Sequence, residues 1–90
     1  MLQSVSIIVE GLVQGVFYRQ TTKAKAIESG ITGTIKNKRD GSVQIIATGT
    51  EHQLEQLIQW CNKGPDRAVV TGVTVEKIPL QDFKEFDIVR

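Results

Sequence analysis

A glycine-containing segment that ends in an arginine has the clearest chemical potential in the sequence. Residues 11–19 read GLVQGVFYR and join an expected strand to an expected helix. Unpaired backbone N–H groups converge at a helix start, where the helix dipole also favours an anion of phosphate size. Arg19 adds a planar fork of donors suited to two phosphate oxygens. Spacing alone favours a simpler interpretation, in which the glycines form a tight turn and Arg19 is a solvated surface residue, because a loop of this kind is a weak signal by itself.

A second pattern pairs Cys61 with Arg67 at the C-x5-R spacing of cysteine-dependent phosphatases. We interpret this match as a coincidence. Cys61 completes the apolar face of an expected helix, so its thiol should be buried and inert, with a pKa that is not lowered. Pro65 removes one N–H from the would-be cradle, and Asp66 places a negative charge in it.

The elements that must position these residues begin with a strand and a helix. Val5, Ile7 and Val9 recur with the two-residue period of a strand that buries one face, and we expect Gly11 to end it. A helix is expected over roughly 18–29, since Gly30 suits the left-handed position just past a helix end.

A hairpin and a second helix follow. Two β-rich runs flank the turn sequence NKRDG at 37–41, which predicts a hairpin over 32–49. Thr50 and Gln53 form a capping-box pair ahead of apolar residues at helical spacing, and Gly64 with the following proline ends that helix. The apolar residues on its buried face are Leu54, Leu57, Ile58 and Cys61.

Two further β-type runs, 68–78 and 85–89, complete a β-α-β-β-α-β order with a terminal strand. This order predicts an α+β, ferredoxin-like βαββαβ sandwich in a single domain, residues 1–90. Its mainly antiparallel sheet of four to five strands should carry both helices on one face. Metal carriers, RNA binders, regulatory domains and enzymes share this topology, so the fold does not give the function.

Composition narrows the classes of function. The chain has 90 residues, 11 Lys+Arg against 10 Asp+Glu, one Cys and one His. This size excludes a multidomain enzyme, and a single thiol with a single imidazole excludes a disulfide framework or a Cys/His zinc site. A net charge of +1 without a basic stripe argues against a nucleic-acid partner. The short, polar-interrupted apolar stretch at the start predicts neither a signal peptide nor a membrane span, so we expect a cytoplasmic protein.

The segment GLVQGVFYR resembles the acylphosphatase signature G-x-V-Q-G-V-x-F-R, with Tyr18 in place of the usual Phe. The segment GTIKNKRDGSVQIIATG is similar to the second signature of that family, and both occur in order at family spacing. The sequence departs from the pattern at Ser29, Thr34 and Ile35, while Phe17 fills a position that is often small. The resemblance spans nearly the whole chain and implies an acylphosphatase.

The resemblance also implies roles for individual residues. Arg19 would bind the phosphoryl group, Asn37 would position the attacking water, and the backbone of a short loop would cradle the phosphate. The residues of that loop are Gln14, Gly15, Val16, Phe17 and Tyr18. Without the resemblance, Asn37 would be interpreted as a turn residue that bonds its own backbone.

The implied chemistry needs few residues. The leaving group of an acyl phosphate is a carboxylate with a pKa of about 4, which departs without a general acid. Fixed donors and one guanidinium can stabilise the charge on the phosphoryl oxygens. The resemblance thus implies a hydrolase of a small-molecule acyl phosphate that binds phosphate or sulfate, uses no metal or cofactor, and is a monomer. The alternative is a non-catalytic phosphate-binding or regulatory domain that keeps the fold and the cradle.

The other polar candidates are weaker. His52 lies near the start of the second helix without a carboxylate partner close in sequence, so it is poor support for a general base. Lys36, Lys38 and Arg39 surround Asn37 and could steer an anion, although a charged hairpin tip is normally a solvated turn.

Overall fold

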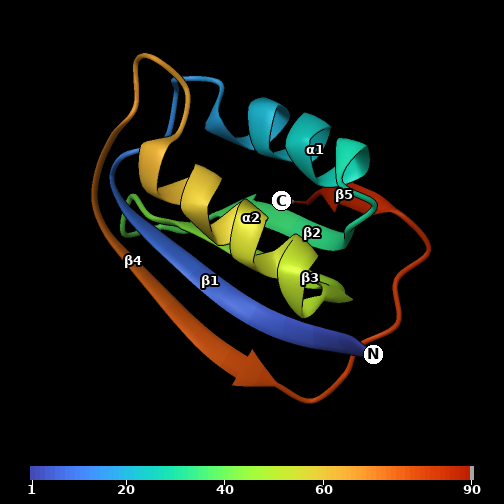
Figure 1. Cartoon of the computed structure of the whole chain (residues 1–90). Helices are drawn as coiled ribbons and strands as arrows, with labels where there is room; N and C mark the ends of the chain where they lie inside the picture. The colour runs from blue at the N-terminus through green and yellow to red at the C-terminus, as the bar shows by residue number, and fades with distance from the viewer. Residues whose placement is uncertain (90) are drawn as a thin grey trace.

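A five-stranded sheet with two helices on one face forms the fold of the computed structural model, which describes residues 1–89 (Figure 1). In chain order the elements are β1 (Leu2–Leu12), α1 (Tyr18–Glu28), β2 (Thr32–Asn37), β3 (Val43–Thr50), α2 (Glu51–Lys63), β4 (Val69–Ile78) and β5 (Phe86–Ile88). The strand order is β4-β1-β3-β2-β5. All neighbouring strands are antiparallel except β2 and β5, which are parallel. The expected ferredoxin-like α+β sandwich is confirmed.

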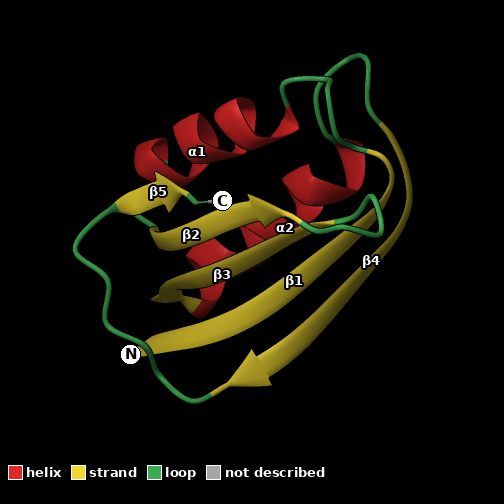
Figure 2. Cartoon of the chain, turned by 180° about the vertical axis from the view of Figure 1, so that it is seen from behind, coloured by secondary structure: helices red, strands yellow, loops and turns green. Residues whose placement is uncertain are grey.

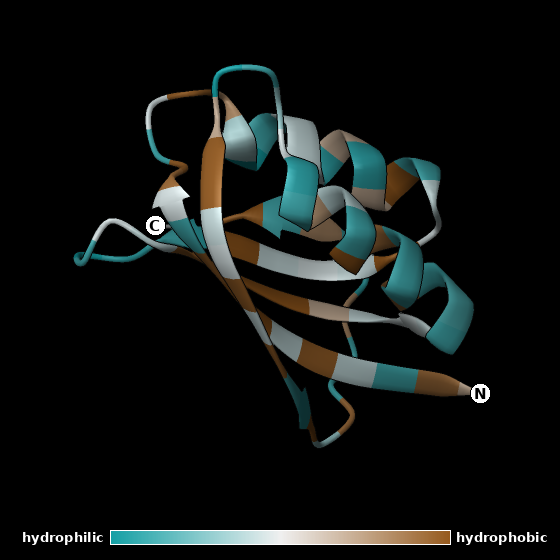
Figure 3. Cartoon of the chain, turned by 60° about the vertical axis from the view of Figure 1, so that its left-hand side comes forward, coloured by the Kyte–Doolittle hydropathy of each residue, from teal (hydrophilic) through white to brown (hydrophobic). Residues whose placement is uncertain are grey.

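The hydrophobic core lies between the sheet and the two helices. Seen from behind, the other face of the sheet carries no helix from residues 1–89 (Figure 2). Along β1 apolar and polar bands alternate (Figure 3), and Ile7 and Val9 are fully buried on the inner side. From the helices, Ala26 and Leu57 contribute to the same core. The period-two pattern therefore determines which face of β1 receives the helices.

β1 continues beyond the position where the sequence suggested that it would end. Gly11 does not close the strand, because a bulge between Glu10 and Gly11 shifts the register with β4 and pairing resumes up to Leu12. Gly11 has φ 124°, and a Cβ on it would overlap the carbonyl oxygen of Val69. Glycine therefore serves here to bend the strand without ending it.

Ser4 differs from a simple alternating pattern because it is buried, with 1% of its surface exposed. Its hydroxyl lies 2.6 Å from that of Thr48 and accepts a hydrogen bond from the backbone N–H of Gln81. The Thr48 hydroxyl donates in turn to the carbonyl of Gln81. The connection from β4 to β5 passes the N-terminal end of β1 (Figure 2), so it covers polar groups that local sequence would leave exposed.

The helix ends follow the sequence signals. α2 begins with the complete capping box of Thr50 and Gln53, and Gly64, at φ 68°, caps its end. α1 begins at Tyr18 and ends at Glu28, close to the expected 18–29. Neither helix in the described part of the chain has the length and hydrophobicity that a membrane crossing requires.

Candidate functional site

The connection between β1 and α1 presents a run of free backbone donors. Among residues 1–89, no backbone or side-chain group accepts a hydrogen bond from the N–H groups of residues 14–20, whereas the N–H of Thr21 already bonds the carbonyl of Phe17. No side chain caps the start of α1 either. Converging N–H groups at a helix start form a binding site for an anion of phosphate size. The segment predicted from GLVQGVFYR therefore has the free donors that a phosphate cradle needs.

The cradle loop takes its shape from two left-handed residues. Gly15 has φ 75° and Phe17 has φ 64°, and Phe17 is the sole non-glycine residue with positive φ among residues 1–89. No atom of the described residues lies within 4 Å of a Cβ built on Gly15, so its backbone conformation and not lack of space favours glycine there. A bulky residue in this region is strained by about 1–3 kcal/mol, and such strain concentrates at functional sites.

Arg19 faces a cavity of about 350 Å3 beside the cradle. The cavity is lined by cradle residues together with apolar residues of the loop and of β5: Val13, Gly15, Phe17, Tyr18, Arg19, Gln20 and Ile88. The side chain of Arg19 is half-buried and bonds no other residue in the described chain, so its donors remain available for an anion. A guanidinium in this place supplies the paired donors that phosphate oxygens accept.

Gln14 joins the cradle loop to the β2–β3 hairpin. Its side-chain Nε2 donates to the carbonyl of Lys38 at 2.8 Å and to the carbonyl of Ser42 at 2.9 Å. Both segments lie at the same end of the sheet (Figure 1). The side chain of Gln14 is thus occupied in holding the loop, and its backbone N–H is the group left for the cradle.

Asn37, the last residue of β2, lies next to this junction and carries an unusual buried acceptor. Its Oδ1 is buried and has no hydrogen-bond partner in the described chain, the one such side-chain atom among residues 1–89. An unpartnered buried acceptor costs about 1–3 kcal/mol, so the site favours a donor such as a water molecule. Asn37 does not line the Arg19 cavity. It lines a neighbouring hollow of about 450 Å3 with Lys36, Lys38, Arg39 and Asp40.

The hairpin tip beside Asn37 carries a local excess of positive charge. Lys36, Lys38 and Arg39 contribute three cations, and Asp40 contributes the one carboxylate. That carboxylate is engaged with Ser42, whose hydroxyl lies 2.6 Å and whose N–H lies 2.9 Å from Asp40 Oδ1. These hydrogen bonds lower the pKa of Asp40 below its ordinary value. The asparagine therefore stands in surroundings that attract an anionic substrate.

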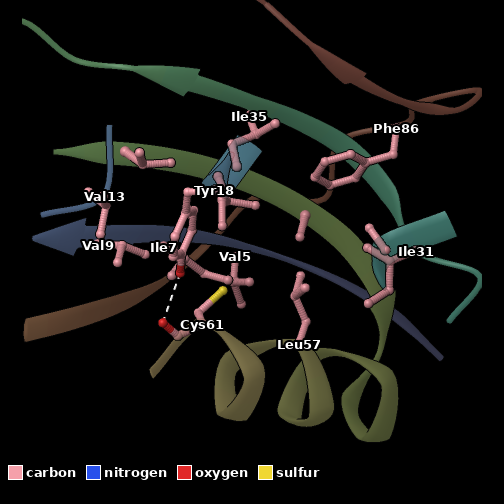
Figure 4. Packing of buried hydrophobic residues seen from close by; sticks show 14 of the residues in the cluster. Val5, Ile7, Val9, Val13, Tyr18, Ile31, Ile35, Leu57, Cys61 and Phe86 are labelled. Carbon is pink, nitrogen blue, oxygen red and sulfur yellow. Dashed lines mark hydrogen bonds between the residues drawn. The ribbon is translucent and has the colours of Figure 1, made fainter. Parts of the chain in front are cut away.

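Tyr18 and Cys61 attach the start of α1 to α2. The Tyr18 hydroxyl donates to the backbone carbonyl of Cys61 at 2.8 Å, the dashed line in Figure 4. The ring of Tyr18 packs 5.4 Å from the ring of Trp60, measured between centroids. Burial raises the pKa of the Tyr18 hydroxyl. Tyr18 is therefore an anchor for the first turn of α1, with its N–H as its contribution to the cradle.

The thiol of Cys61 has the properties of a core residue. Its surface is fully buried, and burial raises its pKa to about 12, against an ordinary 9.0. A nucleophilic cysteine needs the opposite, an accessible thiol with a lowered pKa. Interpreting the C-x5-R match of Cys61 and Arg67 as a coincidence is consistent with these properties.

The structure brings together part of the predicted site in one cavity. Gly15, Phe17, Tyr18 and Arg19 line it. Val16 directs its side chain into the core, with 9% of its surface exposed. Ile88 also lines the cavity, and no local pattern predicts its presence there. It is placed there because β5 pairs in parallel with β2 and Ile88 lies opposite Ile35, a long-range pairing without a local signal.

Metal-binding side chains do not cluster in the part of the chain that the structure describes. No group of three or more His, Cys, Asp or Glu side chains there could hold an ion. His52 is exposed near the start of α2, and its imidazole Nε2 lies 3.2 Å from Nε2 of Gln56 on the same helix. Its contact is therefore with its own helix surface, and neither cavity is lined by it.

Comparison with known proteins identifies relatives of this chain and of its fold. The family model described as Acylphosphatase matches residues 5–88. An acylphosphatase of Marinobacter nauticus is 47% identical over 81 residues, which cover 89% of this chain and 88% of the relative. An acylphosphatase of Methylococcus capsulatus is 39% identical over 90 residues, covering 99% of this chain and 98% of the relative. The crystal structure of acylphosphatase from Bacillus subtilis superposes with a TM-score of 0.95 at 34% identity and covers 100% of both chains.

Proposed function

The chain belongs to the acylphosphatase family and hydrolyses acyl phosphates, and from that premise we propose that the reaction takes place between the cradle loop and Asn37. The observation that carries the proposal is the run of free N–H groups over residues 14–20, which leads directly to a half-buried Arg19 without a protein partner in the described chain. No observation favours the alternative of a non-catalytic anion-binding domain.

The cradle loop and Arg19 bind the phosphoryl group. The backbone donors of Gln14, Gly15, Val16, Phe17 and Tyr18 surround the equatorial oxygens, and the guanidinium contacts two of them. Because these donors are fixed before the substrate arrives, they stabilise transition-state charge without reorganisation. A loose phosphoryl transition state leaves charge on those oxygens, so preorganised donors can supply most of the catalysis.

Asn37 orients the attacking water. Its buried Oδ1 lacks a partner in the described chain and accepts a hydrogen bond from that water, while its amide N–H2 can donate to the phosphoryl group. Gln14 holds the hairpin against the cradle and so fixes the distance between Asn37 and the phosphate. Alignment of a water with phosphorus and the leaving oxygen lowers the entropic part of the barrier.

The bond changes involve substrate and water alone. The water oxygen bonds to phosphorus, the bond from phosphorus to the acyl oxygen breaks, and the electron pair leaves with the carboxylate. The water protons remain with phosphate or pass to solvent. A carboxylate with a pKa of about 4 needs no proton to depart, so the mechanism requires neither a general acid nor a metal. A small acyl phosphate is the substrate, and we expect the enzyme to act as a monomer in the cytoplasm.

The test measures release of inorganic phosphate from benzoyl phosphate and from acetyl phosphate in the presence of EDTA. We expect turnover by the wild-type chain that EDTA does not reduce. Calorimetric titration with inorganic phosphate gives the second readout, because Arg19→Ala should weaken phosphate binding. Binding of phosphate without hydrolysis of either substrate would overturn the proposal in favour of a binding domain.

A further inference from the structure

An exposed aromatic side chain stands at the edge of the phosphate cradle. Phe17 exposes 69% of its surface, although its neighbours Val16 and Tyr18 are buried. Its backbone lies at φ 64°, a conformation in which asparagine or glycine would be less strained. Neither the hydrophobic core nor the partly buried residues packed on it include Phe17. The folded chain thus holds an aromatic ring in solvent at a position that disfavours it.

The same ring lines the Arg19 cavity together with other apolar groups. Val13 and Ile88 are the aliphatic members of the lining. A phosphate group, with its bridging oxygen, has four oxygens of about the size of water, so it fills on the order of 100 Å3 at about 30 Å3 per water. The cavity measures about 350 Å3 and therefore leaves space beside the phosphate. That space has an apolar side, which is the usual means of binding an organic group.

From this geometry we infer that Phe17 contacts the acyl group of the substrate and favours acyl phosphates with an aromatic or large apolar acyl group. The inference rests on the proposed site, because the acyl group is bonded to the phosphate that the cradle holds. A ring at the cradle edge lies within reach of the substituent carried by that phosphate. Aromatic rings gain from contact with one another in offset or edge-to-face arrangements, which gives a benzoyl group an advantage over an acetyl group.

The experiment compares kcat/KM for benzoyl phosphate and acetyl phosphate in the wild type and in Phe17→Asn. Asparagine accepts the left-handed backbone and removes the ring. We expect the ratio of kcat/KM, benzoyl over acetyl, to fall about five- to tenfold, mainly through a higher KM for benzoyl phosphate. Phe17→Tyr keeps the ring and should retain the wild-type ratio.

A matched control is Leu80→Asn. Leu80 exposes 63% of its surface, comparable to Phe17, but it does not line the cavity. This variant should leave the ratio unchanged, so a general effect of removing exposed apolar surface is separated from an effect at the site. An unchanged ratio in Phe17→Asn, or an equal loss for both substrates, would overturn the inference. Wild-type chain that hydrolyses neither substrate would instead overturn the proposed site and function.

Discussion

Arg19 supplies a fork of donors that no group in the described chain already occupies. In the mechanism that we propose, its guanidinium contacts the phosphoryl oxygens both in the bound substrate and in the transition state, so its removal should weaken binding and turnover together. For Arg19→Ala we expect kcat/KM to fall on the order of 10²–10³-fold, as for the loss of one strong oxyanion donor. Initial rates of phosphate release over a range of substrate concentration give kcat and KM separately.

Two further variants separate the shape of Arg19 from its charge. Arg19→Lys keeps the charge and loses the fork, so we expect it to recover only part of the activity. Arg67→Ala removes an exposed arginine that lines neither cavity and should leave kcat/KM unchanged. An Arg19→Ala enzyme with wild-type kcat and KM would exclude the guanidinium from phosphoryl binding.

Asn37 is expected to show opposite effects on catalysis and on stability. Asn37→Ala removes the group that we propose orients the water, so kcat should fall about 10²-fold or more while KM changes little. The substitution also removes a buried acceptor without a partner in the described chain, whose cost is about 1–3 kcal/mol. The free energy of unfolding should therefore stay constant or rise. Denaturant unfolding and kinetics on the same preparation test both parts, and an unchanged kcat would remove the water-positioning role.

At the scale of elements, two hydrogen bonds from one amide hold the cradle loop to the hairpin. Gln14→Glu replaces the Nε2 donor by an oxygen that faces the carbonyls of Lys38 and Ser42. We expect the loop to move away from the hairpin and kcat/KM to fall about tenfold or more, because the spacing between cradle and water is lost. The measurement is kcat/KM for acetyl phosphate in this variant and in the wild type.

The matched control for Gln14 is another glutamine on the sheet. Gln44 Nε2 lies 3.3 Å from the Ser6 hydroxyl and lines neither cavity. Gln44→Glu should lower the free energy of unfolding about as much as Gln14→Glu does, without a loss of activity. If both variants lost activity in proportion to their loss of stability, Gln14 would be a stabilising residue without a positioning role.

Local signals in the sequence predicted most element positions. The capping box at Thr50 and Gln53 and the turn over 37–41 are each complete within a few residues, so helix α2 and the hairpin could be placed. The extension of β1 past Gly11 depends on its pairing with β4, and the burial of Ser4 depends on a hydrogen bond from Gln81. Contacts between residues far apart in the sequence determine these two features, so the local alternation of apolar and polar residues cannot predict them.

In the candidate site too, the features set by local sequence could be predicted and those set by long-range contacts could not. A glycine loop before a helix and a following arginine were a weak signal by themselves, and the resemblance to the family was needed to predict a phosphate cradle there. The free backbone donors of this loop fit that prediction. The occupation of the Gln14 side chain by the hairpin was not foreseen, since its acceptors lie 24 and 28 residues away. Neither was the left-handed backbone of Phe17, which glycine or asparagine would signal and phenylalanine does not.

For the whole molecule, the proposed chemistry uses no group that titrates near neutral pH. The side-chain amide of Asn37 does not ionise, and the leaving carboxylate has a pKa of about 4. With a fully ionised substrate we expect kcat to vary less than about twofold from pH 5.5 to 7.5. Stopped assays in buffers of constant ionic strength measure this profile. A steep bell-shaped profile would show that a titrating group takes part.

Stability at high pH should depend on the buried thiol between the sheet and α2. Folding raises the pKa of Cys61 from 9.0 to about 12, so in this interval the folded chain retains a proton that the unfolded chain has lost. Unfolding then releases a proton and becomes more favourable as pH rises. We expect the free energy of unfolding to be insensitive to this thiol below about pH 8 and to fall by about 1.4 kcal/mol from pH 8 to 10.

Urea unfolding at several values of pH measures this loss, and two variants identify its source. Cys61→Ala should be less stable throughout and should lose most of the decline between pH 8 and 10, because no thiol remains to titrate. Leu57→Val also creates space in the core, since Leu57 is 3% exposed, but it keeps Cys61 and should retain the full decline. The pKa of Tyr18, which burial also raises, adds a further loss above pH 10 in all three proteins. An equal decline in Cys61→Ala and in the wild type would show that the thiol does not couple to folding.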